Sequence, residues 1–333
     1  IMILHLDKKI GASTANQLAV QAKAFLLDKN DYYVMVLPCG VKEIPSYLTP
    51  YVLDSWVMPT DMQLSSSDYN SLKHKIEIAG TYIGGDEKNT LMIAGPCSIE
   101  SEEQIEQSCQ MLVDLGIKVL RAGCFKPRTS PYTFRGLGLE GLKLLSKMRD
   151  KYGLKIATEV RDATHVDHVI EYADIIQIGA KSMYDHGLLS ACGQSDKVVI
   201  LKRNYGATLQ EFVHCADFMM SLGNEKIILC ERGIRTFETK TRFSLDLCGV
   251  AWLKQYTNLP VILDPSHAMG YDYGVPNLAR ACMAMGVDGL LIETHPNPKV
   301  ALSDASQQLN HQQFREMYES LKPIAAAVGK NLV

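Results

Sequence analysis

The chain has 333 residues, of which 47% are hydrophobic and 21% charged, so it has the composition and length of a globular protein with a sizeable core. Its formal net charge of −3 argues against nucleic acid or an anionic membrane as the main partner. The nine cysteines form no CxxC pair, which favours free thiols in a reducing cytoplasm over a disulfide framework. No run approaches the ~18 apolar residues that a membrane span requires. We therefore expect a cytoplasmic protein without a signal peptide.

The first part of the chain predicts a small α+β domain over residues 1–72. Residues 2–8, 32–38 and 52–59 have the composition of short strands, and residues 14–27 carry apolar side chains at helical spacing. The polar, serine-rich stretch 60–73 is typical of a linker. Residues 75–95 then predict a hairpin that leads into a buried strand.

The remainder, residues 73–333, predicts a single large α/β domain. Short apolar runs alternate with amphipathic stretches, several of which end in glycine, the usual helix stop. Eight βα units in roughly 250 residues are typical of a TIM (β/α)8 barrel, and this count disfavours a doubly wound open sheet. The eight expected strands lie within residues 91–95, 117–123, 154–160, 174–180, 197–203, 225–232, 259–267 and 287–295.

A polar or reactive side chain follows or ends every expected strand. In a TIM barrel the carboxyl ends of the strands carry the chemistry, so these positions are the candidates for a site. They are, in chain order, Cys97, Arg121, Glu159, Lys181, Lys202, Arg232, His267 and Glu293.

Six cations belong to this set or to the loop CFKPRTSPYTF at 124–134. If these six side chains lie close together, their positive charges repel one another unless anions bind between them. Phosphate and carboxylate are the anions that Arg and Lys bind best. For any one of these residues, a surface position or an ion pair is the simpler explanation, whereas the shared placement favours an anion site. The six are Arg121, Lys126, Arg128, Lys181, Lys202 and Arg232.

Four other side chains have the chemistry of metal ligands: Cys97, His267, Glu293 and Asp304. A thiolate, an imidazole and two carboxylates suit Mn, Fe, Co or Zn better than Mg. Each has an ordinary alternative, because Cys97 could be a small core residue, His267 a loop histidine and Glu293 the partner of a cation. Their joint placement at strand ends favours the metal site.

Several motifs together make the sequence similar to one family. The chain resembles the 3-deoxy-D-arabino-heptulosonate 7-phosphate (DAHP) synthases, of the type closer to the 3-deoxy-D-manno-octulosonate 8-phosphate synthases. The N-terminal part resembles, by its layout, the ferredoxin-like extension of some members. The motifs are IAGPCSIE (93–100), LRAGCFKPRTSPYTFRGLG (120–138), ADIIQIGA (173–180), ILCERGIRTFE (228–238), DPSHA (264–268) and ETHPNPKVALSDASQQL (293–309).

The resemblance implies a reaction in which phosphoenolpyruvate condenses with erythrose 4-phosphate at the start of aromatic amino-acid (shikimate) synthesis. It implies that Lys126 donates a proton to the forming alkoxide and that His267 belongs to the catalytic centre, and it leaves open which group activates water. By the same carry-over, phosphoenolpyruvate is bound by Arg121, Lys126, Lys181, Lys202 and Arg232; the aldose phosphate by Pro127, Arg128, Thr129 and Ser130; and a divalent metal by Cys97, His267, Glu293 and Asp304.

One position departs from the family pattern. Family members commonly read IGAR where this chain reads IGAK, so Lys181 keeps the charge but loses the two-pronged guanidinium. We expect a weaker grip on phosphoenolpyruvate without loss of activity.

Other functions remain as alternatives. An octulosonate phosphate synthase would use arabinose 5-phosphate, but its loop usually reads like KANRSS. A barrel that binds ligands without turnover is a second alternative, and a dehydrogenase lacks its glycine fingerprint here. By analogy, the N-terminal domain would bind tyrosine or phenylalanine as inhibitor, or only stabilise an oligomer, with a tetramer favoured.

Overall fold

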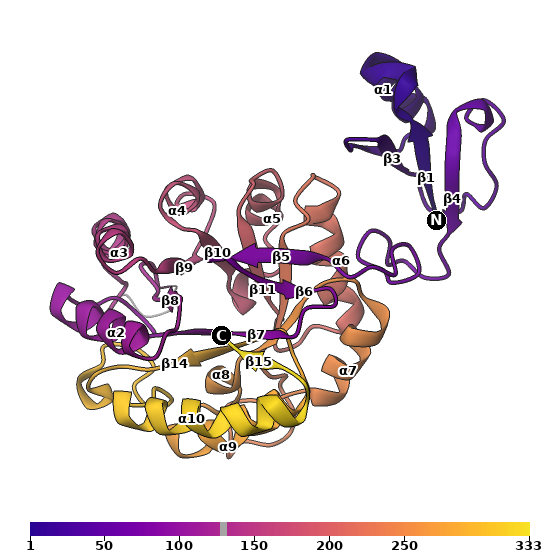
Figure 1. Ribbon diagram of the computed structural model, residues 1–333. Helices are drawn as coiled ribbons and strands as arrows, with labels where there is room; N and C mark the ends of the chain where they lie inside the picture. Colours follow the sequence, from indigo (N-terminus) through magenta and orange to yellow (C-terminus); the bar gives the residue numbers. More distant parts are fainter. Residues whose placement is uncertain (127–131) are drawn as a thin grey trace.

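The computed structural model describes residues 1–126 and 132–333 (Figure 1). A closed barrel of parallel strands forms the larger part, and a small sheet with one helix stands beside it, reached through the segment that follows β4. The eight expected barrel strands are all present as β7 (Asn89–Gly95), β8 (Val119–Arg121), β9 (Lys155–Val160), β10 (Ile175–Ile178), β11 (Val198–Lys202), β12 (Ile227–Glu231), β13 (Val261–Leu263) and β14 (Gly289–Glu293).

Closure of the sheet confirms the predicted barrel. Each strand pairs in parallel with its neighbour in sequence, and β14 pairs in parallel with β7, from Gly289 opposite Leu91 to Glu293 opposite Gly95. An open doubly wound sheet would leave these two strands as unpaired edges. Because all eight strands run the same way, their carboxyl ends form one ring.

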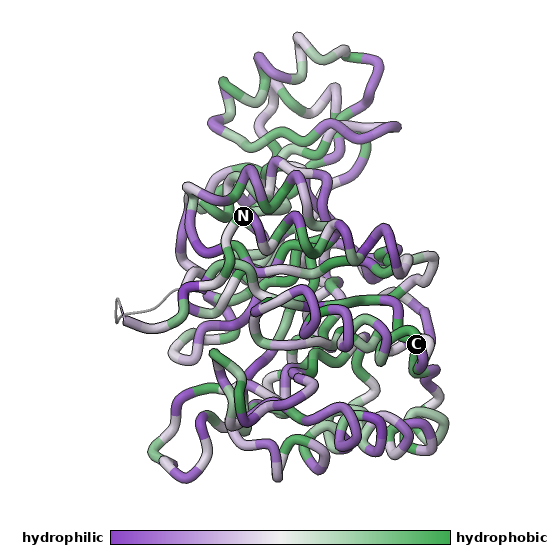
Figure 2. Tube along the Cα trace, turned by 90° about the vertical axis from the view of Figure 1, so that its left-hand side faces the viewer, coloured by the Kyte–Doolittle hydropathy of each residue, from purple (hydrophilic) through white to green (hydrophobic). Residues whose placement is uncertain are grey.

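The helices surround the barrel (Figure 1). Their coils at the lower edge of Figure 2 alternate between hydrophilic and hydrophobic residues, as expected for helices with one buried face. Within the described residues, no helix is long and apolar enough to cross a membrane. The helices of this part are α2 (Glu102–Asp114), α3 (Gly138–Tyr152), α4 (Val166–Tyr172), α5 (His186–Gly193), α6 (Leu209–Met220), α7 (Leu247–Tyr256), α8 (Pro265–Met269), α9 (Val275–Ala284) and α10 (His311–Ala327), with 3-10 turns η3 (Ala180–Ser182), η4 (Asp272–Gly274) and η5 (Pro298–Val300).

A hairpin closes the amino-terminal end of the barrel, as Figure 1 shows beside β7. It consists of β5 (Lys75–Ile78) and β6 (Thr81–Gly84), and β15 (Asn331–Leu332) pairs with β7 nearby. Ile76, Ile78 and Ile83 of the hairpin are buried against the apolar side chains inside the barrel. This end is therefore filled by a dry core, which leaves the opposite end for polar chemistry.

The N-terminal sheet is antiparallel with the order β2-β3-β1-β4. Helix α1 covers one face through Ala15 and Leu18, which pack with Leu4 and Leu6 of β1. This is the β-α-β-β-x-β succession of a ferredoxin-like unit, with only the 3-10 turn η2 where a second helix would be. The elements are β1 (Met2–Asp7), η1 (Lys8–Ile10), α1 (Gly11–Ala22), β2 (Phe25–Asp28), β3 (Tyr32–Val36), η2 (Thr49–Tyr51) and β4 (Val52–Val57).

The helix predicted over 14–27 is too long at its carboxyl end. It stops at Ala22, because Lys23 adopts a left-handed conformation with a φ of 52° and its N–H caps the carbonyls of Ala19 and Val20. The apolar residues from Phe25 onward form strand β2 instead. The predicted end of the helix was wrong because the helical spacing of apolar residues continues by chance into the residues of β2.

The polar stretch 60–73 packs against the barrel. The Asp217 carboxylate on α6 accepts hydrogen bonds from the backbone N–H groups of Gln63 (3.0 Å) and Ser65 (2.8 Å). Lys29 of the N-terminal unit also forms an ion pair with Glu225, with 2.8 Å between Nζ and Oε1. The small unit is thus connected to the barrel by specific polar contacts near α6.

Candidate active site

A pocket of about 120 Å³ opens at the carboxyl ends of the strands. It is rich in charge, with five cations facing three groups that can be anionic or act as bases. Its lining residues are Lys126, Glu159, Ala180, Lys181, Lys202, Arg232, Arg242, His267 and Asp304.

Most of the candidates from the sequence meet here. Seven of them line the pocket directly. Cys97 contacts Lys126 and Asp304 of this lining, and Glu293, the partner of Arg121, lies beside His267. Pro127, Arg128, Thr129 and Ser130 lie outside the described residues. The candidates in the pocket lining are Lys126, Glu159, Lys181, Lys202, Arg232, His267 and Asp304.

Arg121 and Glu293 form a buried ion pair below the pocket. Arg121 Nη1 donates to Glu293 Oε1 at 2.8 Å and to the carbonyl of Pro96 at 2.7 Å, and the two side chains are 1% and 0% exposed. The backbone allows this close packing because Gly95, with a φ of 147°, lies where a Cβ would stand 2.2 Å from the carbonyl of Arg121. The charge of Arg121 is thereby held beside the carboxylate of Glu293.

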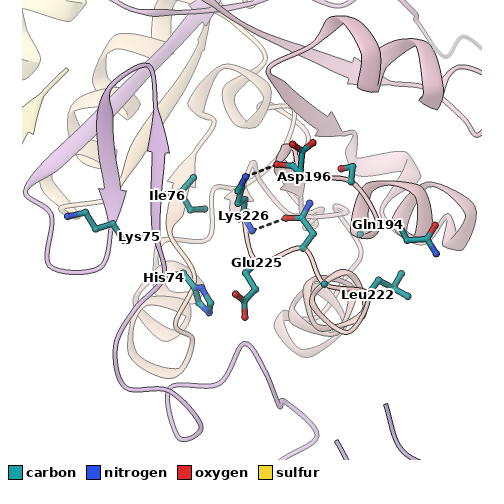
Figure 3. Close-up of a pocket in the computed structure, with 12 residues that line it drawn as sticks. His74, Lys75, Ile76, Gln194, Asp196, Leu222, Glu225 and Lys226 are labelled. Atoms are coloured by element: carbon teal, nitrogen blue, oxygen red, sulfur yellow. Dashed lines mark hydrogen bonds between the residues drawn. The ribbon is translucent and has the colours of Figure 1, made fainter. Parts of the chain in front are cut away.

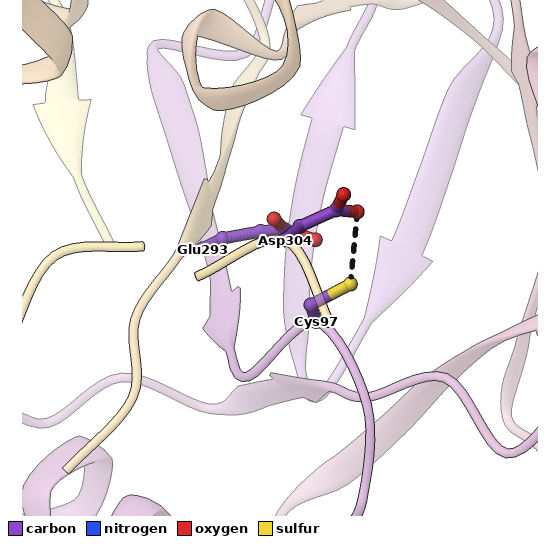
Figure 4. A group of neighbouring side chains, drawn as sticks. All are labelled: Cys97, Glu293 and Asp304. Atoms are coloured by element: carbon purple, nitrogen blue, oxygen red, sulfur yellow. Dashed lines mark hydrogen bonds between the residues drawn. The ribbon is translucent and has the colours of Figure 1, made fainter. Parts of the chain in front are cut away.

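Cys97, Glu293 and Asp304 form a compact group of possible metal ligands (Figure 4). Their ligand atoms all lie within 4.8 Å of one another. The Cys97 thiol donates to Asp304 Oδ2 at 3.2 Å, and His267 Nε2 lies 3.5 Å from Glu293 Oε1. Asp304 has a φ of 44°, an uncommon conformation for a residue other than glycine and one found at functional sites.

The protonation of this group fits a cation site. Burial raises the pKa of the Cys97 thiol to about 12, and the carboxylate of Glu293 adds to the effect. Burial also acts to raise the pKa of Asp304, but His267 and Arg242 outweigh it and hold that pKa below its ordinary value. A divalent transition metal would meet two carboxylates and a thiol that loses its proton on binding.

Asp264 links the cationic side of the site to His267. Its Oδ2 lies 2.9 Å from Lys202 Nζ and 2.7 Å from His267 Nδ1, while its Oδ1 accepts from the backbone N–H of His267 as the cap of α8. Burial alone would raise the pKa of Asp264, yet His267 and Lys202 hold it well below the usual range. This carboxylate orients the imidazole so that Nε2 faces Glu293, as an outer partner does for a metal-binding histidine.

Three further residues of the site were not assigned a role from the sequence. Arg242 belongs to the loop between β12 and α7, so a search limited to the ends of strands does not include it. Its Nη1 donates to Gln307 Oε1 at 2.7 Å. Gln307 Nε2 in turn donates to Glu293 Oε2 at 2.6 Å. Asp264 directly follows β13 and lies three residues before His267. A search for the first polar residue after this strand would therefore have identified Asp264.

A larger cavity lies at the other end of the barrel (Figure 3). Its volume is about 480 Å³, and it is lined by the start of β5 and the loops before β11 and β12. Its two lysines are already engaged, because Lys226 Nζ donates to the carbonyl of Asp196 at 2.9 Å and Lys75 forms an ion pair with Glu87. Size alone would point to this cavity, but the converging charges and metal-type ligands favour the smaller pocket.

Comparison with known proteins finds one family model and many related sequences. A family model described as the DAHP synthetase I family matches residues 67–328. The chain is 46% identical over 238 residues to the phospho-2-dehydro-3-deoxyheptonate aldolase of Thermotoga maritima, which covers 72% of this chain and 70% of that protein. It is 32% identical over 262 residues to the 2-dehydro-3-deoxyphosphooctonate aldolase of Thiobacillus denitrificans, covering 73% and 92%.

Solved structures agree. The crystal structure of the DAHP synthase from Thermotoga maritima superposes with a TM-score of 0.80 at 35% identity and covers 100% of this chain and 98% of that one. A truncated form of 3-deoxy-D-arabino-heptulosonate 7-phosphate synthase from the same organism superposes with a TM-score of 0.76 at 39% identity, covering 82% and 99%. The first match extends over the N-terminal unit as well as the barrel.

The buried pair of Lys202 and Asp264 generates a stability prediction. In Asp264→Asn, Lys202 loses its counter-charge while it stays buried, so we expect the free energy of unfolding to fall by about 3–5 kcal/mol. Urea denaturation of the EDTA-treated protein measures this. The double variant Lys202→Met with Asp264→Asn should lose less than the single variant, and Asp61→Asn at the surface should change little. An equal loss in the single and double variants would show that the unpaired charge is not the cause.

Proposed function

The chain belongs to the DAHP synthetase I family, and we propose that it condenses phosphoenolpyruvate with D-erythrose 4-phosphate. The products are 3-deoxy-D-arabino-heptulosonate 7-phosphate and inorganic phosphate, the first step of the shikimate route to aromatic amino acids. The observation that carries this proposal is the convergence of Lys126, Lys202 and Arg232 on one pocket beside the Cys97 group. Two phosphorylated substrates, one of them also a carboxylate, give these cations the anions that they need.

The roles of the substrate-binding residues follow from charge and position. Lys181, Lys202 and Arg232 line the side of the pocket and would hold the phosphate and carboxylate of phosphoenolpyruvate. Lys126 precedes the predicted aldose-phosphate loop, and its Nζ donates to Cys97 Sγ at 3.0 Å. It therefore stands between the place proposed for phosphoenolpyruvate and the group that would hold the metal.

The proposed reaction joins carbon 3 of phosphoenolpyruvate to the aldehyde carbon of the tetrose. Lys126 donates a proton to the alkoxide that forms. Water adds at carbon 2, and the resulting hemiketal phosphate releases inorganic phosphate by cleavage of its C–O bond, which leaves the ketone. Holding both substrates in bonding reach supplies much of the rate, because orientation can lower a barrier by roughly 7 kcal/mol or more.

A divalent metal, one of Mn, Fe, Co or Zn, would be held by Cys97, His267, Glu293 and Asp304. When bound, it would act as a Lewis acid on the aldehyde oxygen of the tetrose. Asp264 and Gln307 support this set, since Asp264 lies beside the His267 imidazole and accepts from the backbone N–H of that residue, and Gln307 donates to Glu293. The thiol proton of Cys97 would leave on binding, so metal affinity should rise with pH.

The substrate choice is the first thing to test. We expect phosphate release from phosphoenolpyruvate with erythrose 4-phosphate but not with arabinose 5-phosphate, lost in EDTA and restored by Mn²⁺. Turnover of the pentose would instead identify an octulosonate phosphate synthase, the function of more distant relatives. No release with either aldose in the presence of metal would favour a barrel that binds its ligands without turnover.

Lys181 offers a test of affinity. In Lys181→Arg the two-pronged guanidinium should bind the substrate phosphate better, so we expect the KM for phosphoenolpyruvate to fall by roughly 2- to 10-fold with little change in kcat. Steady-state kinetics measure both values. Lys197→Arg, at the other end of the barrel, is the matched control and should change neither. A higher KM for Lys181→Arg would contradict the assignment.

The N-terminal unit is proposed as a regulatory domain for tyrosine or phenylalanine. Its support is its placement as a separate sheet attached near α6 and the match of the relative's whole chain. We expect deletion of residues 1–70 to abolish inhibition by these amino acids while phosphate release continues. Inhibition that persists, together with a change in molar mass by light scattering from the proposed tetramer, would assign the unit to assembly instead.

A further inference from the structure

A stack of two aromatic rings between two cations extends from the pocket to the surface. The guanidinium carbon of Arg232 lies 4.2 Å from the ring centroid of Phe243. The rings of Phe243 and Tyr205 are stacked at 5.3 Å with 20° between their planes, and the guanidinium carbon of Arg235 lies 4.4 Å from the centroid of Tyr205. One end of the stack, Arg232, is 5% exposed, and the other end, Arg235, is an exposed residue.

The backbone holds this stack in place. Phe243 donates its N–H to the carbonyl of Ala268 on α8 at 2.8 Å, and Arg235 donates to the carbonyl of Tyr205 at 2.8 Å. Gly233 has a φ of 101°, and a Cβ there would stand 2.6 Å from the Cβ of Phe243. The absence of a side chain at 233 is therefore what allows the Phe243 ring to pack so close to the chain that carries Arg232.

Arg232 differs from the other buried cations of the site. Within the described residues, Arg121 and Lys202 have carboxylate partners at 2.8 and 2.9 Å, whereas Arg232 forms no ion pair and its buried Nη1 has no hydrogen-bond partner. Burial lowers the pKa of Arg232, and the charge of Asp264, which acts in the opposite direction without forming an ion pair, does not offset it. Its partner is the face of the Phe243 ring.

A ring face is a suitable partner for a guanidinium that must bind an anion. Cation–π stacking uses the flat face of the guanidinium, so its N–H edges stay available for bidentate hydrogen bonds. A carboxylate partner would instead occupy those edges and repel the incoming phosphate. The second ring, Tyr205, supports the first, and Arg235 stacks on the outer side of Tyr205.

We propose that Phe243 and Tyr205 are positioning residues that orient Arg232 so that its free N–H edge receives an oxygen of phosphoenolpyruvate, whose phosphate is the expected anion. The inference rests on the proposed function for the identity of the substrate. Neither ring is catalytic in this scheme, because each acts only through Arg232. Affinity for phosphoenolpyruvate should therefore depend on the rings, while the reaction of the aldose should not.

The test replaces the first ring. In Phe243→Leu, which keeps an apolar side chain without a π face, we expect the KM for phosphoenolpyruvate to rise by about 3- to 30-fold. The kcat and the KM for erythrose 4-phosphate should stay within about twofold, and Phe243→Tyr should restore the affinity. Calorimetric titration of phosphoenolpyruvate into the EDTA-treated protein should show the same loss without any need for turnover.

A double-mutant cycle separates positioning from general packing. If Phe243 acts through Arg232, then Phe243→Leu should cause little further loss of binding in an Arg232→Gln background. Tyr273→Leu is the matched control, because Tyr273 stacks on Tyr271 at 5.9 Å without a cation, and it should bind phosphoenolpyruvate like the unaltered protein. If Phe243→Leu does not fold, Tyr205→Leu takes its place with a smaller expected rise of about 2- to 5-fold.

The outcomes are distinguishable. Unchanged binding in Phe243→Leu, or an equal loss in the presence and absence of Arg232, would overturn the positioning role while the proposed reaction stood. Phosphoenolpyruvate that binds to the unaltered protein in the titration and weakens in Phe243→Leu would support the stack even if no aldose were turned over. Failure of the unaltered protein to bind phosphoenolpyruvate at all would contradict both.

Discussion

The parallel pairing of β14 with β7 is the contact on which the site depends. It joins the last barrel strand to the first, although Gly289 and Leu91 are far apart in the sequence. Because the strands are parallel, this closure brings all eight carboxyl ends to one rim. Glu293 at the end of β14 thereby reaches both Arg121 at the end of β8 and the thiol of Cys97 after β7. Neither the metal-type group nor the buried ion pair would exist in an open sheet.

The buried cations at this rim are of two kinds. Arg121 and Lys202 are paired with Glu293 and Asp264, and all four side chains are buried. Burying a charge without a partner is costly, so these pairs allow the cations to be present before any substrate arrives. Arg232 has an aromatic ring in place of a carboxylate. The site therefore keeps an unpaired positive charge for an anion at Arg232, while the charges of Arg121 and Lys202 are already balanced.

The other parts of the molecule leave the carboxyl ends of the strands as the place for the site. The hairpin of β5 and β6 fills the opposite end with Ile76, Ile78 and Ile83, which turns the lower half of the barrel into a dry core. The N-terminal sheet is attached on the side of α6, through Asp217 and the ion pair of Lys29 with Glu225. Glu225 lies two residues before the start of β12, the strand that leads to Arg232.

The sequence by itself determined the barrel and most of the residues at its rim. Short apolar runs predicted the eight strands, because a strand that is buried on both faces consists almost entirely of apolar residues. Cys97, Lys202 and Arg232 were identified because they follow or end such runs. Local patterns could not show that Asp264 bridges Lys202 and His267, that Arg242 enters the pocket from a long loop, or that the spacing at 14–27 changes from helix to strand at Lys23. Those features were decided by the tertiary structure, because each depends on a backbone path or on contacts between distant residues that only ring closure brings together.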